Sequence, residues 1–170
     1  MNLSLESIIS ELSEFSLPAW QEIPDIELYM DQVLSLVERY LRTEKNADEK
    51  LLTSSMVNNY VKYRIIPPPT AKKYTRSHVA CLLMLCLLKP LLSTAEIRQL
   101  FSAAGAEGIE NLYGSFREIL KTTAGTTAKA LQKTSDDAAE AVLYSVLRAR
   151  AEQTVAVRLL AMLAPEENET

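Results

Sequence analysis

Two adjacent asparagines and the cations around them are the side chains with the clearest chemistry in this sequence. Asn58 and Asn59 lie within residues 53–76, a stretch rich in Lys, Arg and Tyr. An asparagine amide can bond adenine through two atoms at once in the major groove, and Lys or Arg side chains neutralise phosphates. Residues 50–95 hold seven Lys or Arg and no Asp or Glu, although the whole chain has a net charge of -4. This segregation predicts a basic module with a polyanionic partner.

Side chains suited to catalysis or metal binding are sparse. The chain has one His and no Gly-rich phosphate loop, CxxC pair or HExxH motif, so the usual residue sets for nucleophilic, metal or dinucleotide chemistry are missing. His78 and Cys81 are three residues apart, but two ligands do not make a zinc site. Cys81 and Cys86 point about 140° apart on one expected helix and cannot pair with each other. We therefore expect no enzymatic activity, no cofactor, no metal and two reduced thiols.

The composition indicates an all-α protein. Of the residues 48% are apolar and only 4 are Gly, and alternating runs of β-branched residues are missing. The most apolar run, residues 79–88, is about half of the ~20 residues that a membrane span requires. Three glutamates interrupt the N-terminal stretch where a secretory signal would lie. The expected location is cytoplasmic, with no membrane partner.

Helical spacing of apolar residues predicts helices over residues 5–15, 26–41, 54–63, 78–88, from 93 or 94 to near 105, 109–133 and 136–163. Asp25 is placed to cap the second of these, Thr75 or Ser77 the fourth, and Ser135 the last. The fourth is apolar almost all round, which predicts burial on several sides. Gly114 and Gly125 leave open a break in the 109–133 helix.

The expected 54–63 helix separates polar from apolar side chains. Asn58, Asn59 and Lys62 fall on neighbouring exposed positions with Ser55, while the apolar residues between them are available for a core. Prolines 67–69 end this helix and stiffen the chain after it, and a basic segment follows. The order is that of a recognition helix followed by a wing whose cations contact phosphates. The predicted DNA-binding residues are Ser54, Ser55, Asn58, Asn59, Lys62, Tyr63, Arg64, Lys72, Lys73, Tyr74 and Arg76.

This order of residues resembles the DNA-binding domain of MerR-type regulators. In that domain a recognition helix with a tyrosine leads through two aliphatic residues into prolines, a basic wing with a tyrosine, and a further pair of helices. The matching positions are Val57, Tyr60, Ile65, Ile66, Pro67, Pro68, Lys72, Tyr74 and the helix start at 75–79, and the later SxxEIRQLF of residues 93–101 resembles the next helix.

The sequence also departs from the MerR-type pattern. Asn58 stands where that pattern has arginine, Val61 where it has glutamate, Arg64 where it has glycine, and Lys72 where the wing has arginine. The charged connector 43–50 replaces the tight turn before the recognition helix, which leaves open which segment forms the first helix of the motif.

Over nearly its whole length the sequence resembles a bacterial family catalogued as domain of unknown function 1836. The signatures are PDIELYMDQVL from Pro24, LLTSSMVNNYVKYRIIPPP from Leu51, and the KKYTRSHVACLLMLCLLKPLLSTAEI that follows. That family is presumed to act in transcription.

Together these features predict an all-α fold with a MerR-like winged helix-turn-helix module embedded in a helical bundle. Residues 1–24 form an N-terminal helix and linker, residues 25–105 the DNA-binding module, and residues 106–170 a helical hairpin that serves dimerisation or completes the core. The expected function is transcriptional regulation, with double-stranded DNA and a second copy of the chain as partners. The alternative is a non-enzymatic protein–protein interaction module. No small-molecule effector is identified by the sequence.

Overall fold

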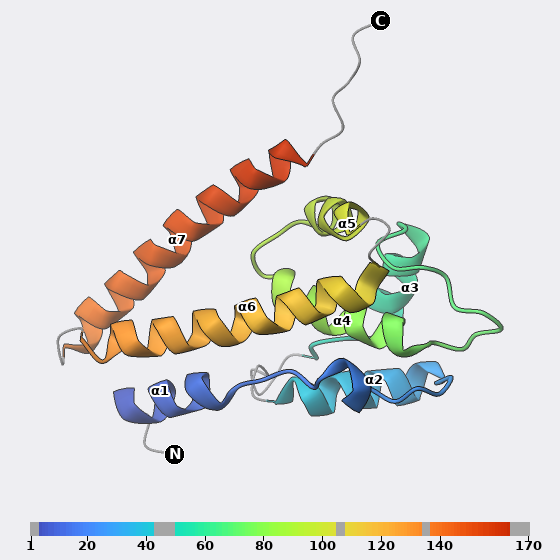
Figure 1. Ribbon diagram of the computed structural model, residues 1–170, viewed down its shortest axis with the longest axis horizontal. Coiled ribbons are helices and arrows are strands. Elements are labelled where there is room, and N and C mark those ends of the chain that lie inside the picture. Colours follow the sequence, from blue (N-terminus) through green and yellow to red (C-terminus); the bar gives the residue numbers. More distant parts are fainter. Residues whose placement is uncertain (1–3, 43–49, 105–107, 134–136, 164–170) are drawn as a thin grey trace, which may run out of the picture.

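The computed structural model describes residues 4–42, 50–104, 108–133 and 137–163, and in these the regular structure is helical, as the sequence predicts (Figure 1). None of the helices among the described residues is long and apolar enough to cross a membrane. The elements are α1 (Leu5–Glu14), the 3-10 turn η1 (Trp20–Glu22), α2 (Met30–Tyr40), α3 (Ser54–Lys62), α4 (Arg76–Leu88), α5 (Thr94–Ala103), α6 (Gly108–Leu131) and α7 (Ala138–Met162).

Short polar side chains set the starts of several helices. The Ser93 hydroxyl accepts from the Glu96 amide, and the Glu96 carboxylate accepts from the Ser93 amide at 2.7 Å, a capping box that begins α5. These bonds hold the pKa of Glu96 below its usual value. At α4, Thr75 is the cap residue, which confirms one of the two predicted positions.

The predicted start of the second helix is wrong. Leu28 forms an antiparallel bridge with Tyr74, with two backbone hydrogen bonds of 2.9 and 2.8 Å, and this pairing keeps the chain extended through residue 28. The helix α2 therefore begins at Met30, where Gln32 accepts a hydrogen bond from the Tyr29 amide at 2.8 Å. Asp25 lies upstream and caps nothing.

The two C-terminal helices also differ in detail from the prediction. Helix α6 is continuous and passes through both Gly114 and Gly125. Neither glycine lies in close contact with another element. The cap of α7 is Asp137, whose carboxylate accepts from the Ala139 amide at 2.9 Å, so the helix begins at Ala138. The predicted cap, Ser135, lies outside the described residues.

Helix α4 is the centre of the core. Its residues from His78 to Leu85 are buried, as its all-round apolar sequence predicts, and it packs against α2 and α6. Helix α1 lies beside α6 (Figure 1). The segment after α1 is fastened to α6 by two long-range bonds: Tyr113 donates to the Pro18 carbonyl and Arg117 to the Leu17 carbonyl, each at 2.9 Å.

Helix α7 runs back from the end of α6 at an angle to it, and its C-terminal part approaches α5 (Figure 1). Only Ala141 and Leu160 on this helix are buried. Gln99 of α5 donates to the Leu160 carbonyl at 2.7 Å, and Gln153 donates to the carbonyl of Leu91 at 2.8 Å. Its exposed large apolar side chains are Val142, Leu143, Tyr144, Val146, Leu147, Val155, Val157, Leu159 and Met162, followed by Leu163.

Candidate nucleic-acid interface

Helix α3 divides its side chains as the sequence predicts. The Thr53 hydroxyl caps the helix by accepting from the Met56 amide at 3.2 Å. Val57 and Tyr60 are buried in the core, which fixes the rotation of the helix. The opposite side is polar and exposed: Ser54, Ser55, Asn58, Asn59 and Lys62.

Helix α3 ends in a motif that normally uses glycine. The Arg64 amide donates to the Val61 carbonyl at 3.0 Å, and the Ile65 amide donates to the Tyr60 carbonyl at 2.9 Å. This pair of bonds is the Schellman ending, which requires a left-handed residue after the helix. Arg64 is that residue, with φ of 55°, and a side chain in this conformation costs about 1 kcal/mol more than glycine. The MerR-type pattern has glycine at this position.

The segment predicted to be a wing is a tight turn. The Lys73 amide donates to the Thr70 carbonyl at 2.9 Å, and Ala71 and Lys72 both have positive φ, 49° and 63°, as in the two-residue turns that close hairpins. The described residues contain only isolated bridges here, Thr70 with Lys73 and Leu28 with Tyr74, and no strand. Lys72 lies exposed at the tip of the turn.

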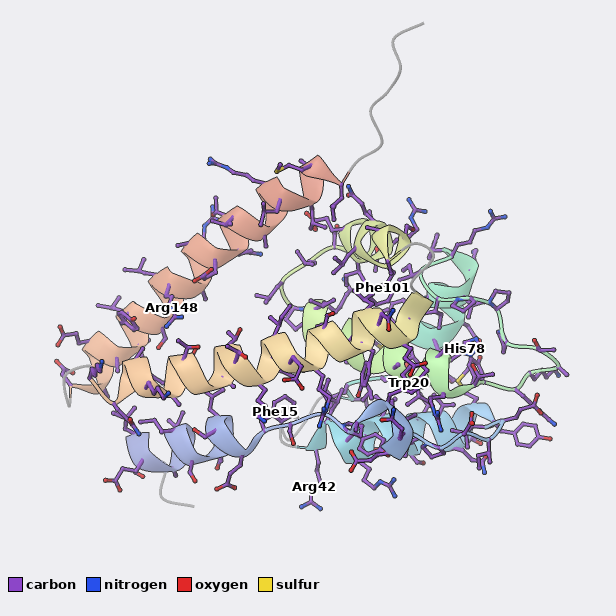
Figure 2. The ribbon with its side chains drawn as sticks, in the orientation of Figure 1. Phe15, Trp20, Arg42, His78, Phe101 and Arg148 are labelled. Carbon is purple, nitrogen blue, oxygen red and sulfur yellow. The ribbon has the colours of Figure 1, made fainter. Side chains whose placement is uncertain are left out.

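The cations of this segment have different surroundings. The Arg76 guanidinium donates to the Ile23 carbonyl at 2.9 Å and lies over the Trp20 ring at 5.7 Å, and its side chain is only 19% exposed. Asp25 is 3.7 Å away. Arg76 therefore fastens the start of α4 to the segment before α2. This contact gives Arg76 a role in the fold (Figure 2 shows Trp20 in the body of the molecule).

Lys73 and Tyr74 are also engaged within the fold. The Lys73 ammonium lies 2.8 Å from the Glu27 carboxylate, whose hydrogen bond and charge raise the pKa of Lys73. Tyr74 is 3% exposed and packs edge-on against His78, with ring centroids 5.4 Å apart. The Tyr74 ring therefore belongs to the core, while Tyr63 at the end of α3 is exposed and lies beneath the Lys62 ammonium.

His78 is a buried residue that takes part in the cap of α4. Its Nδ1 accepts from the Thr75 amide at 3.0 Å, which requires this nitrogen to be unprotonated. Burial lowers the pKa of His78, opposed in part by the carbonyl groups of Pro67 and Pro68. The imidazole is therefore neutral at pH 7 and acts as part of the helix cap.

Three cations near the end of α3 form no ion pair with any described residue: Lys62, Arg64 and Lys72. Arg98 of α5 joins Lys62 and Arg64 around one cleft. Arg98 is not among the DNA-binding residues predicted from the sequence. The local signal was present, because Ile97 and Phe101 are buried and place Arg98 on the solvent side, but which helix it faces depends on long-range packing.

The model of one protein family matches residues 18–116, which is more than half of the chain but not the nearly whole length that the sequence resemblance predicted, and its description is Domain of unknown function (DUF1836). The chain belongs to this family. The matched DUF1836 segment contains α2 to α5, and hence α3, the turn at Lys72 and Arg98. Comparison with the curated proteins and with the solved structures found no match.

Within the DUF1836 segment the thiols and the histidine are core residues. Cys81 and Cys86 are free, as predicted, and burial raises the pKa of each thiol to about 12. Both are therefore protonated and weakly nucleophilic at neutral pH. Among the described residues, no three His, Cys, Asp or Glu side chains lie close enough together to hold a metal ion.

Proposed function

We propose that this chain is a non-enzymatic DNA-binding transcriptional regulator that reads the major groove with α3. The observation that supports this most is the exposed polar side of α3, continued by cations that no described carboxylate neutralises. Figure 1 shows α3 and the turn that follows it at the same end of the molecule. A convex helix with amides in its middle and cations beside it suits a groove bordered by phosphates.

The proposed roles follow from exposure and pairing. Asn58 and Asn59 would contact base edges, and the hydroxyls of Ser54 and Ser55 would bond the adjacent phosphates or bases. Lys62, Arg64 and Lys72 would contact phosphates, with Tyr63 beside them. Lys73 and Arg76 contribute less in this proposal, since Glu27 and the carbonyl of Ile23 already engage them. Helix α2, which packs on α3, would be the first helix of a MerR-like helix-turn-helix.

A homodimer is part of the proposal, and α7 supports it. Large apolar side chains on a helix are normally buried against another element, yet α7 exposes most of its large apolar side chains. Glu140 lies near its start and Arg158 near its end. Two copies of α7 that cross near Ala149 in antiparallel orientation would place Glu140 of each opposite Arg158 of the other. Such a two-fold pair would present two copies of α3 to two half-sites.

Binding to pooled genomic DNA fragments at several salt concentrations tests this proposal. Three phosphate contacts per protomer predict that log affinity falls against log salt with a slope of roughly -3 for one protomer and about twice that for a dimer. Selected fragments should share a sequence. Binding that is absent at low salt would contradict DNA binding.

The alternative is a protein–protein interaction module, and the exposed apolar side chains of α7 favour it. This function predicts that a partner is captured through α7, that DNA affinity is negligible, and that binding changes little with salt. The salt series therefore separates the two functions.

A further inference from the structure

A cleft of about 590 Å³ lies between the end of α3, the proline segment and α5. Its floor is apolar: Ile65 and Ile66 follow α3, and Phe101 comes from α5, all three buried or nearly so. Figure 2 shows Phe101 on α5 near the start of α6. Cys81 of α4 also contributes to the floor, and its thiol is protonated, so it acts as an apolar group.

The described residues on the rim of this cleft carry positive charge only. Among the described residues that line the cleft, Lys62, Arg64 and Arg98 are the charged ones, and none is a carboxylate. Four other clefts among the described residues each combine their cations with at least one carboxylate. In the angle between α6 and α7, for example, Arg148 lies 4.0 Å from Glu152. The cations at the end of α3 are therefore arranged for an external anion.

The backbone of Arg64 strengthens this argument. Its left-handed conformation would suit glycine, and the strained geometry follows from the Schellman bonds rather than from its side chain. A residue kept in an unfavourable conformation is an observation that points to function. The side chain kept at this strained position is a guanidinium that lines the cleft.

We propose that this cleft binds a small amphipathic anion, an organic molecule with a carboxylate or a similar acid group on an apolar body. The volume is within the range of small-molecule sites, which combine an apolar lining with a few placed polar groups. The acid group would be bound by Arg64 and Arg98, with Lys62 beside them, and the apolar body would cover Ile65 and Phe101. Because Lys62 and Arg64 also belong to the proposed DNA interface, such a ligand would compete with DNA.

The probe for this site is 8-anilinonaphthalene-1-sulfonate, titrated by fluorescence into the full-length protein without DNA. We expect a saturable phase that octanoate displaces and the neutral analogue 1-octanol does not displace at the same concentration. Arg64→Gly and Arg98→Gln should each weaken that phase about fivefold, the size expected for one partly exposed charge contact. The matched control is Arg148→Gln, in the cleft between α6 and α7, which should leave the phase unchanged; circular dichroism checks that each variant is folded.

Three results would overturn the proposal. Equal affinity in Arg64→Gly, Arg98→Gln and wild type would place the dye elsewhere, for example on α7. Displacement by 1-octanol as strong as by octanoate would show that charge has no part in binding. Displacement by inorganic phosphate equal to that by octanoate at matched ionic strength would show that the cations serve only as phosphate contacts. Since DNA is absent, these results do not depend on whether the protein binds DNA.

Discussion

At the scale of single residues, the segment from Arg64 to His78 contains a strained backbone position, a packed guanidinium and a buried imidazole that can titrate. Arg64 has a left-handed backbone conformation. The guanidinium of Arg76 donates a hydrogen bond to the Ile23 carbonyl and lies over the Trp20 ring. The Nδ1 atom of His78 accepts a hydrogen bond from the Thr75 amide at the start of α4. Each of these three features contributes to the free energy of unfolding, and each leads to a prediction about stability.

Arg64→Gly should stabilise the fold. Relief of the left-handed strain should stabilise the folded protein by about 1 kcal/mol or more. The greater freedom of glycine in the unfolded chain opposes this gain by roughly 0.4–1 kcal/mol. The expected net gain in the free energy of unfolding is about 0.5 kcal/mol, measured by urea denaturation. Arg64→Ala keeps the strain and removes the guanidinium, so it should be less stable than Arg64→Gly. The reverse order would show that the left-handed strain at residue 64 costs less than the extra freedom of glycine in the unfolded chain.

Arg76→Ala should destabilise the fold by about 1.5–3 kcal/mol, because it leaves the Ile23 carbonyl without its charged donor and removes the contact with Trp20. The matched control is Lys73→Ala. Its ion pair with Glu27 is exposed, so the loss of stability should be much smaller than for Arg76→Ala. Equal losses of stability in the two variants would contradict the proposal that Arg76 fastens the start of α4 to the segment before α2.

The pH dependence of stability should report His78. Its pKa is lowered in the folded protein, so between that pKa and about 6.5 the unfolded chain binds more protons than the folded one. The contribution of His78 to stability is therefore complete above pH 6.5 and is lost as the pH falls. His78→Gln keeps an acceptor for the Thr75 amide but does not titrate. The free energy of unfolding should fall more steeply from pH 7 to pH 5 in wild type than in His78→Gln; parallel curves would exclude this account.

At the scale of elements, the sequence predicted most of what is set locally. The periodicity of α3, the all-round apolar pattern of α4 and the cap at Thr75 depend on neighbours within a turn or two, and the features predicted from them are confirmed. The start of α2 was wrong because it depends on the pairing of Leu28 with Tyr74, which are far apart in the chain.

The candidate site shows the same division between local and distant contacts. Counting charge along the sequence treats residues 50–95 as uniformly basic, but the fold brings Glu27 to Lys73 and Asp25 to Arg76. It also brings Arg98 to the end of α3. The spacing of residues along the chain predicts neither the ion pairs of Lys73 and Arg76 nor the position of Arg98 beside the end of α3. The exposed side of α3 does, because helical rotation and two buried residues, Val57 and Tyr60, fix it.

At the scale of the whole molecule, α7 exposes more large apolar side chains than any other described element. The combined substitution Leu143→Glu and Leu147→Glu places charge on two exposed apolar positions one turn apart. If α7 pairs with a second copy, wild type should be a dimer by light scattering at micromolar concentration and this variant a monomer of unchanged helical content. Asn111→Glu, an exposed position on α6, should stay dimeric. A monomeric wild type would contradict the pairing.

We propose that α3 reads DNA sequence, and base discrimination in matched variants tests this role of α3. A site selected from genomic fragments is titrated by fluorescence anisotropy against a random duplex of equal length, with wild type, Asn58→Ala/Asn59→Ala and the control Asn111→Ala. The account predicts a clear preference in wild type and in the control, reduced in the double variant by about 1–3 kcal/mol for each lost bidentate contact, with residual binding that keeps its salt dependence. The same preference in the double variant as in wild type, or none in any of the three, would contradict it.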